Sequence, residues 1–266
     1  MGEGSTTASR DALAKTLAAA RLGGPPTKTL QEAEAPRSVA EAYAVQDLVH
    51  RELAGFGALS GHKIGCTTPV MQAYLGIDHP CAGEVFAGTV FRDHADLPLA
   101  RFHRIGVECE IAVRLGSDIA DIGRPHDRDT VRDHVAAVMA GIELVDDRYA
   151  DFPSMPPTAL IADDFFNAGV VLGQEITDWQ AMDLSGLEGG MLVDGEPVGR
   201  GVGADILGHP LEALAWLANH RLAIGRPLAA GTFVMLGSLV KTVHFDRPAK
   251  VRIEIEQLGG ASVRFT

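Results

Sequence analysis

The apolar positions at the start of the chain repeat with the period of a helix. Residues 8–22 are rich in Ala and Leu at this spacing, and Gly23-Gly-Pro-Pro26 ends the pattern. Ser38-Val-Ala-Glu41 has the form of a capping box and opens a second helical pattern that runs to about Leu53. The apolar stripe of this second pattern consists of Ala42, Val45, Leu48 and Val49. The chain therefore begins with a helical portion, which we place at residues 1–56.

From Gly57 onward, short β-like runs, frequent glycines and turns marked by proline dominate. Alternation with period two predicts a strand over Val107–Leu115, and Val193-Asp-Gly-Glu196 predicts the tight turn of a hairpin. Further strands are expected at 234–236, 241–245 and 251–257, and further helices at 70–75, 127–140 and 210–222. Because regular βαβ alternation is weak, we predict an α+β fold, with a mixed, curved β-sheet over residues 57–266.

Composition narrows the classes of function. The chain has 266 residues, 46% of them hydrophobic, which is enough for a sizeable core. A formal charge of −12 without a Lys/Arg cluster argues against binding of nucleic acid or an anionic membrane. The three cysteines are odd in number and lack metal-finger spacing, and no apolar run reaches the roughly 18 residues of a membrane span. Since the N-terminus also lacks the pattern of a signal peptide, we expect a cytoplasmic protein.

Three glutamates are the strongest candidates for chemistry. The alternation in Val107–Leu115 puts Glu108 and Glu110 on one face, roughly 6 to 7 Å apart at the backbone. Glu143 lies among apolar neighbours, where an unpaired carboxylate would be costly. Like charges held this close need nearby cations or a bound metal ion. Three convergent glutamates would form a hard oxygen site suited to Mg²⁺ or Mn²⁺, whereas the alternative is an ordinary solvated face.

Other motifs are weaker. Gly61-His-Lys-Ile-Gly65 places Lys63 between glycines, where a ligand can approach the backbone closely. A lysine there can bind a carboxylate, or transfer a proton if its pKa is lowered, but a surface lysine is the alternative. Gly199–Gly203 lacks the Lys-Ser/Thr of a phosphate loop, and neither Ser185 nor Ser238 has a Gly-x-Ser-x-Gly frame. These patterns do not support a nucleotide site or a serine hydrolase.

Several motifs in order carry a family resemblance: Gly61–Gly65, the loop from Gln72 to Pro80, Val107–Ala112 and Glu143–Arg148. From about residue 38 to its end, the chain resembles the 2-keto-4-pentenoate hydratase / 4-oxalocrotonate decarboxylase family of the fumarylacetoacetate hydrolase superfamily. The resemblance implies a fumarylacetoacetate hydrolase-like sheet in the catalytic domain, a homo-oligomer, and a small 2-oxo or 2-hydroxy dienoic acid as substrate. It also implies that Mg²⁺ or Mn²⁺ is held by Glu108, Glu110 and Glu143.

The same resemblance implies roles for residues around the metal. Lys63 matches the active-site lysine of the family, and Ile64 beside it is expected to bind substrate. Asn167 and Ser238 fall where the family has small polar residues that contact the substrate. The family's Asp-Asn-x-Ser stretch reads Asp163-Asp-Phe-Phe-Asn167 here, which predicts a bulkier and more apolar wall.

One departure concerns the catalytic base. Family hydratases often carry an aspartate at the position of Cys81, and Glu84 follows three residues later. A thiol replaces a carboxylate base only if its pKa is depressed. We therefore expect Cys81 or Glu84 to work with the lysine.

The implied activity is that of a metal-dependent lyase of aromatic catabolism, which adds water to a 2-hydroxy-2,4-dienoate to give a 4-hydroxy-2-oxo acid. One alternative is decarboxylation of 2-oxo-3-hexenedioate, whose second carboxylate would need Arg148 or His62, although Arg148 can equally pair with a structural acid. Another is hydrolysis of an acylpyruvate C–C bond, which needs a His–Glu pair that is not evident near the N-terminal helices. The last alternative is a protein that kept the fold and binds small molecules without catalysing a reaction.

Overall fold

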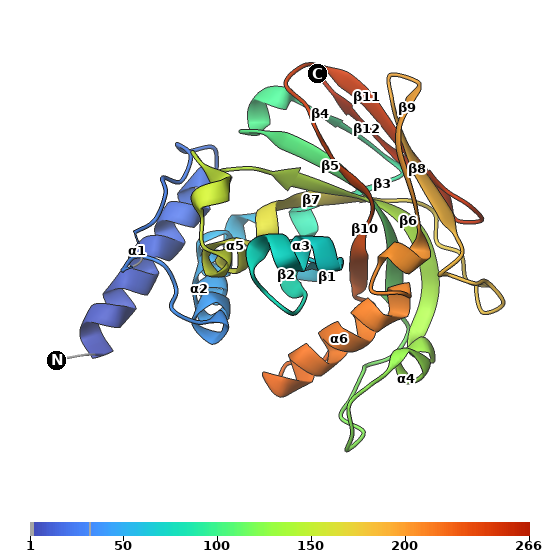
Figure 1. Ribbon diagram of the computed structural model, residues 1–266, viewed down its shortest axis with the longest axis horizontal. Helices are drawn as coiled ribbons and strands as arrows, with labels where there is room; N and C mark the ends of the chain where they lie inside the picture. Colours follow the sequence, from blue (N-terminus) through green and yellow to red (C-terminus); the bar gives the residue numbers. More distant parts are fainter. Residues whose placement is uncertain (1–2, 32) are drawn as a thin grey trace.

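The computed structural model describes residues 3–31 and 33–266. Within them, strands are joined in one sheet in the order β2-β1-β10-β5-β6-β7-β3-β4-β12-β11-β8-β9. The strands are β1 (Leu59–Gly65), β2 (Cys81–Phe86), β3 (Val90–Arg92), β4 (His94–Leu97), β5 (Ile105–Leu115), β6 (Val135–Asp146), β7 (Asn167–Leu172), β8 (Glu188–Val193), β9 (Glu196–Val202), β10 (Phe233–His244), β11 (Ala249–Ile255) and β12 (Gly259–Phe265). Parallel and antiparallel pairs both occur, and β5 and β6 bend strongly through the middle of the molecule (Figure 1). The predicted mixed, curved sheet is confirmed.

Helices lie at the start of the chain and on the faces of the sheet. They are α1 (Glu3–Arg21), α2 (Val39–Glu52), α3 (Pro69–Leu75), α4 (Arg128–Arg132), α5 (Pro157–Ala162) and α6 (Pro210–Ala223). The helices predicted at 8–22, 70–75 and 210–222 and the one following Ser38 are confirmed. Ser38 caps α2 by accepting a hydrogen bond from the amide of Glu41, while the Glu41 carboxylate accepts one from the amide of Arg37. No helix in the described ranges combines the length and apolarity needed to cross a membrane.

The helix predicted at 127–140 is wrong beyond its first turns. Only Arg128–Arg132 is helical, and β6 begins at Val135. β6 lies between β5 and β7 and is buried on both faces, so its sequence is a continuous apolar run without alternation. Such a run does not distinguish a buried strand from a buried helix.

Other strand predictions need smaller changes. The strands expected at 234–236 and 241–245 are one strand, β10, whose pairing with β5 shifts register between Met235 and Val243. The hairpin turn is as predicted, with Asp194 and Gly195 both at positive φ as a tight two-residue turn requires.

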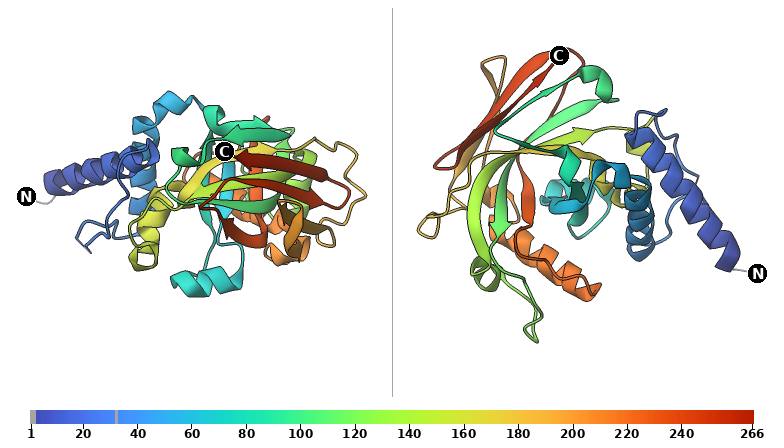
Figure 2. Two further views of the ribbon diagram at one scale, coloured as in Figure 1. Left: turned by 90° about the horizontal axis from the view of Figure 1, so that it is seen from above. Right: turned by 180° about the vertical axis from the view of Figure 1, so that it is seen from behind.

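The two largest of three clusters of buried side chains join the sheet to the helices. The larger lies between the sheet and α6 and includes Ile64, Ile111 and Leu214. The second joins α1, α2 and α5 to residues such as Cys81 and Phe165. Figure 2 shows α1 and α2 to one side of the sheet in both views. The helical N-terminal portion therefore shares a core with the rest of the chain, and a domain boundary between 56 and 57 stays a prediction.

Candidate metal and substrate site

The register of two central strands brings the three predicted glutamates together. Glu108 on β5 pairs directly with Glu143 on β6, and Glu110 lies two residues further along the same face of β5. One carboxylate oxygen of each lies within 4.8 Å of one from each of the others. The opposite face of β5 carries Val107, Cys109 and Ile111 into the larger core cluster. We call Glu108, Glu110 and Glu143 the carboxylate trio.

Each carboxylate of the trio is oriented by a neighbouring donor. The backbone N–H of Gly237 donates to Glu110 Oε2 at 2.9 Å, and the side-chain amide of Asn167 donates to Glu143 Oε1 at 2.9 Å. The Thr242 hydroxyl donates to Glu108 Oε1. Gly237 has a φ of +121°, and a Cβ there would lie 2.3 Å from the Thr67 hydroxyl, so only glycine can present this N–H.

Lys63 brings a cation to the trio. Its strand, β1, runs parallel to β10, and the register puts Lys63 beside Met235, which pairs with Ala112 on the face of the trio. The ammonium lies 3.3 Å from Glu143 Oε1 and donates to the carbonyl oxygen of Phe165 at 3.1 Å. Burial lowers the pKa of Lys63, but the three carboxylates outweigh burial and the net shift is upward. The buried lysine therefore stays an ammonium ion.

The trio carries more negative charge than Lys63 can balance. Burial, with repulsion from Glu143 and Glu108, raises the pKa of Glu110 well above its ordinary value, and burial also raises the pKa of Glu143. If all three carboxylates ionise, one ammonium leaves two negative charges in a buried place. Oxygen donors of this kind and number fit a divalent hard cation such as Mg²⁺ or Mn²⁺.

Two residues expected at the site lie on the other side of the sheet. Across β1 and β2, Glu84 pairs with His62, whereas Lys63 pairs with Gly83. Because successive side chains of a strand point to opposite faces, the side chain of Glu84 points away from Lys63 and the trio. It forms an ion pair with Arg221 of α6. Ile64 likewise packs into the core cluster beneath α6. The expectation that Glu84 works beside Lys63, and that the Ile64 side chain contacts substrate, is not met.

Cys81 is on the same face as Lys63 but does not behave as a base. The hydrogen bond with Cys66, together with burial, raises the pKa of the Cys81 thiol, so it stays protonated at neutral pH. The same hydrogen bond lowers the pKa of Cys66. A depressed pKa at Cys81 was the condition for its expected catalytic role, and this condition is absent.

Arg148 pairs with a structural acid, which is one of the two roles considered for it from the sequence. Its guanidinium is 1% exposed, lies 2.8 Å from Asp163 Oδ2, and donates to the carbonyl of Phe166 at 3.1 Å. His62, the other cation considered for a second carboxylate, faces α6, where burial lowers its pKa to about 3 and keeps it neutral. Neither side chain is available for a distal carboxylate of the substrate.

The two small polar residues differ in what they offer. Asn167 is buried, and while its amide donates to Glu143, its Oδ1 has no partner among the described residues. That oxygen is free to accept a hydrogen bond from a ligand. The Ser238 hydroxyl instead donates to the carbonyl of Val240 at 2.6 Å, within the irregular part of β10.

A buried ion cluster lies behind the site. The carboxylate of Asp164 is 2.6 Å from Arg21 Nη1 at the end of α1 and 2.9 Å from His50 Nε2 on α2, and it accepts from the amide of Glu84. Burial disfavours its charge, but His50 and Arg21 outweigh burial and lower the pKa of Asp164. Burial lowers the pKa of His50, but Asp164 outweighs it, and the net shift of His50 is upward. We call Asp164, His50 and Arg21 the ion cluster.

Sequence reasoning missed several groups at the site. The Phe165 carbonyl carries no signal in the sequence, because every residue type has this group, and the Gly237 N–H is marked only by the glycine itself. Thr242 lies in a segment predicted to be a strand, but its hydrogen bond to Glu108 depends on the register between β10 and β5. His50 reads as one of ten scattered histidines.

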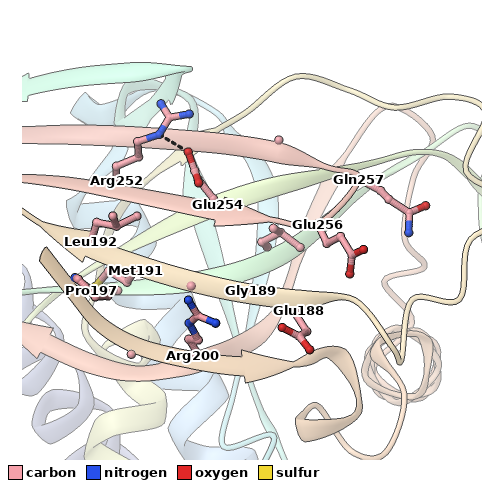
Figure 3. A pocket seen from close by; sticks show the side chains of 14 residues that line it. Glu188, Gly189, Met191, Leu192, Pro197, Arg200, Arg252, Glu254, Glu256 and Gln257 are labelled. Atoms are coloured by element: carbon pink, nitrogen blue, oxygen red, sulfur yellow. Dashed lines mark hydrogen bonds and ion pairs between the residues drawn. The ribbon is translucent and has the colours of Figure 1, made fainter. Parts of the chain in front are cut away.

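A separate hollow of about 510 Å³ lies over β8, β9 and β11. Figure 3 shows it lined by Arg200, Glu188 and the Arg252–Glu254 ion pair, with Met191 and Leu192 nearby. No predicted site residue lines it. It is therefore distinct from the carboxylate trio.

Comparisons with known proteins identify relatives of the chain. Residues 84–266 match the family model described as fumarylacetoacetate (FAA) hydrolase C-terminal. The chain is 32% identical over 266 residues to 2-keto-4-pentenoate hydratase of Paraburkholderia xenovorans (strain LB400), covering 95% of this chain and 98% of that one. It is 31% identical over 234 residues to 2-oxo-hept-4-ene-1,7-dioate hydratase of Escherichia coli, covering 86% and 87%.

Among solved structures, the chain is similar to 4-oxalocrotonate decarboxylase from Pseudomonas putida G7, complexed with magnesium and adipate. The TM-score is 0.89 at 27% identity, and the match covers 97% of each chain. The likeness therefore extends over the helical N-terminal portion as well as the sheet.

The Arg148–Asp163 pair generates a prediction about stability. Arg148→Met leaves Asp163 buried without its partner, and we expect the free energy of unfolding in urea to fall by about 3–5 kcal/mol. The double variant Arg148→Met/Asp163→Leu removes both charges and should recover most of this loss. An Arg148→Met protein of unchanged stability with only a raised KM would show instead that Arg148 binds substrate.

The raised pKa of His50 generates a prediction about pH. The contribution of His50 to stability is fully present below its unfolded pKa of about 6.5 and is lost as the pH rises through the higher folded value. The free energy of unfolding of the wild type minus that of His50→Gln should therefore shrink as the pH rises above about 6.5. Chemical denaturation across this range checks it, and a difference that grows with pH would contradict the sign.

Proposed function

The chain belongs to the fumarylacetoacetate hydrolase family, and from that premise we propose that it is a divalent-metal-dependent hydratase. Its substrate is a 2-hydroxy-2,4-dienoate and its product a 4-hydroxy-2-oxo acid. The observation that carries the proposal is the carboxylate trio, in which two buried glutamates and a half-buried one surround a single ammonium, so that two negative charges are unbalanced when all three ionise. The named sequence relatives are hydratases of such acids, and the named structural relative was solved with magnesium.

Glu108, Glu110 and Glu143 would hold Mg²⁺ or Mn²⁺. When bound, the ion supplies a Lewis acid that polarises the 2-oxo end of the substrate and offsets the excess negative charge. Thr242, the Gly237 amide and Asn167 keep the three carboxylates aimed at one point. This orientation is present without ligand, so binding costs little rearrangement.

The lowered pKa that would let Lys63 accept a proton is absent, so Lys63 is suited to hold the substrate and, as an ammonium ion, to donate a proton. An ammonium has three N–H groups, and with one donated to Phe165 and one directed at Glu143, a third remains for the substrate. The dienol loses its hydroxyl proton and gains one at its terminal carbon, giving a 2-oxo-3-enoate. Water then adds its oxygen at carbon 4 and a proton at carbon 3. Lys63 is placed for such transfers, whereas Cys81 and Glu84 are not.

Decarboxylation of 2-oxo-3-hexenedioate is the second candidate, favoured by the structural likeness to 4-oxalocrotonate decarboxylase. That reaction needs a seat for a second carboxylate, and the two cations considered for it, Arg148 and His62, are engaged or neutral. Hydrolysis of an acylpyruvate finds less support, because the described residues contain no hydrogen-bonded His–Glu pair. Assembly as a homo-oligomer and a cytoplasmic location stay predictions.

Turnover of 2-hydroxypenta-2,4-dienoate tests the proposal. With Mg²⁺ or Mn²⁺ the ultraviolet absorbance of the dienoate should fall, 4-hydroxy-2-oxopentanoate should form, and chelator should stop both. Glu108→Gln should lower kcat about a thousandfold because the ion loses a charged ligand. Glu188→Gln, at the separate hollow, is the matched control and should act as wild type.

This substrate has no second carboxylate to lose as CO₂, so the outcomes separate the candidates. Failure of the wild type to convert the dienoate, combined with metal-dependent CO₂ release from 2-oxo-3-hexenedioate, would replace the hydratase by a decarboxylase. Metal-independent turnover would contradict the role of the trio.

A further inference from the structure

The segment that contacts both Lys63 and Glu143 has an unusual backbone. Asp164, Phe165 and Phe166 are consecutive non-glycine residues with φ of +52°, +47° and +67°. Left-handed conformations are unfavourable for residues with a Cβ and normally occur singly. We call residues 164–166 the left-handed turn. It persists only if contacts with the surrounding structure compensate for this conformation.

The left-handed turn supplies two contacts to the site. The Phe165 carbonyl accepts the hydrogen bond from Lys63 at 3.1 Å, and the Phe165 ring lies 5.8 Å from the Lys63 ammonium. Asn167, directly after the turn, donates to Glu143 at 2.9 Å. A relaxed turn would therefore move both the lysine and one carboxylate of the trio.

Two separate sets of contacts hold the ends of the turn. On the later side, Arg148 donates to the carbonyls of Phe166 and Asn167. On the earlier side, the fully buried Asp164 carboxylate is held by Arg21 of α1 and His50 of α2. The Phe165 carbonyl lies between these anchors. The N-terminal helices, which contribute no carboxylate to the trio, therefore reach the site through Asp164.

We infer that Asp164 is a positioning residue, through which Arg21 and His50 hold the left-handed turn and so aim Lys63. Asp164 does not itself face the substrate, because its carboxylate is engaged by the ion cluster and the Glu84 amide. The inference rests on the proposed function for the meaning of kcat. The contacts that it describes do not depend on which acid is the substrate.

Two substitutions at one position separate positioning from other roles. Asp164→Ala and Asp164→Gly both remove the carboxylate, but only glycine adopts positive φ without penalty. For Asp164→Ala we expect kcat to fall about a hundredfold, as for a catalytic group displaced by about 1 Å, with a smaller fall in Mn²⁺ affinity because Asn167 contacts only one carboxylate of the trio. Asp164→Gly should recover about tenfold of that loss. The matched control is Asp47→Ala, which removes an ion pair with Arg226 on the surface of α2 and should retain wild-type kcat.

Three outcomes would overturn the inference. Wild-type kcat in Asp164→Ala with only a lower melting temperature would mean a structural role alone. Equal loss in the alanine and glycine variants would mean that the carboxylate does not act through the turn. If Asp164→Ala does not fold, Arg21→Met removes one anchor while His50 remains, and unchanged kcat in that variant would also refute the inference.

A readout without turnover keeps this test separate from the proposed function. Lys63 is 3% exposed and engaged by the turn, so it should react slowly with an amine-acylating reagent. Mass spectrometry should find Lys63 labelled faster in Asp164→Ala than in wild type, with Asp164→Gly between them. Equal labelling in all three would refute positioning of Lys63, even if no dienoate is turned over. If the wild type is inactive but the labelling differs as expected, only the proposed function fails.

Discussion

The structure depends on how three carboxylates, two of them buried and one half-buried, can be held beside one ammonium. Glu110 and Glu143 are each 1% exposed, and burial together with repulsion within the trio raises the pKa of Glu110. Such an arrangement is unfavourable for folding unless a cation or protons offset the charge. Donors from three different strands converge to fix the carboxylates, so the site is preorganised at a cost to the apo protein. This is the pattern expected where charge excess serves the binding of a metal ion.

The part of the site that follows period two could be read from the sequence. Alternation in β5 places Glu108 and Glu110 together, while the apolar neighbours of Glu143 and the glycines around Lys63 single out the other two residues. Glu84 shows the limit of this reasoning, since its distance along the chain from Cys81 suggests proximity to Lys63, while pairing with β1 puts it one position out of phase. Strand register between distant segments is set by tertiary packing and has no local signature.

The fold, like the site, can be predicted from the sequence only in part. Capping residues and an apolar stripe predict the helices correctly, whereas the sequence of β6, which is buried on both faces, wrongly predicts a helix for part of the strand. The role of Arg148 could not be decided either, because the same residue can serve a substrate or an internal acid. The partner that decides it, Asp163, follows 15 positions later and meets Arg148 only in the folded chain. The left-handed turn has no glycine to mark it in the sequence.

Binding of Mn²⁺, followed by electron paramagnetic resonance, shows directly whether the carboxylate trio holds a metal ion. We expect one Mn²⁺ per chain, displaced by Mg²⁺, with binding lost in Glu143→Gln. Glu84→Gln changes a similarly buried glutamate on the opposite face of the sheet and should bind Mn²⁺ as the wild type does. Retention of the ion by Glu143→Gln, or equal loss in the two variants, would contradict the assignment of the metal to the carboxylate trio.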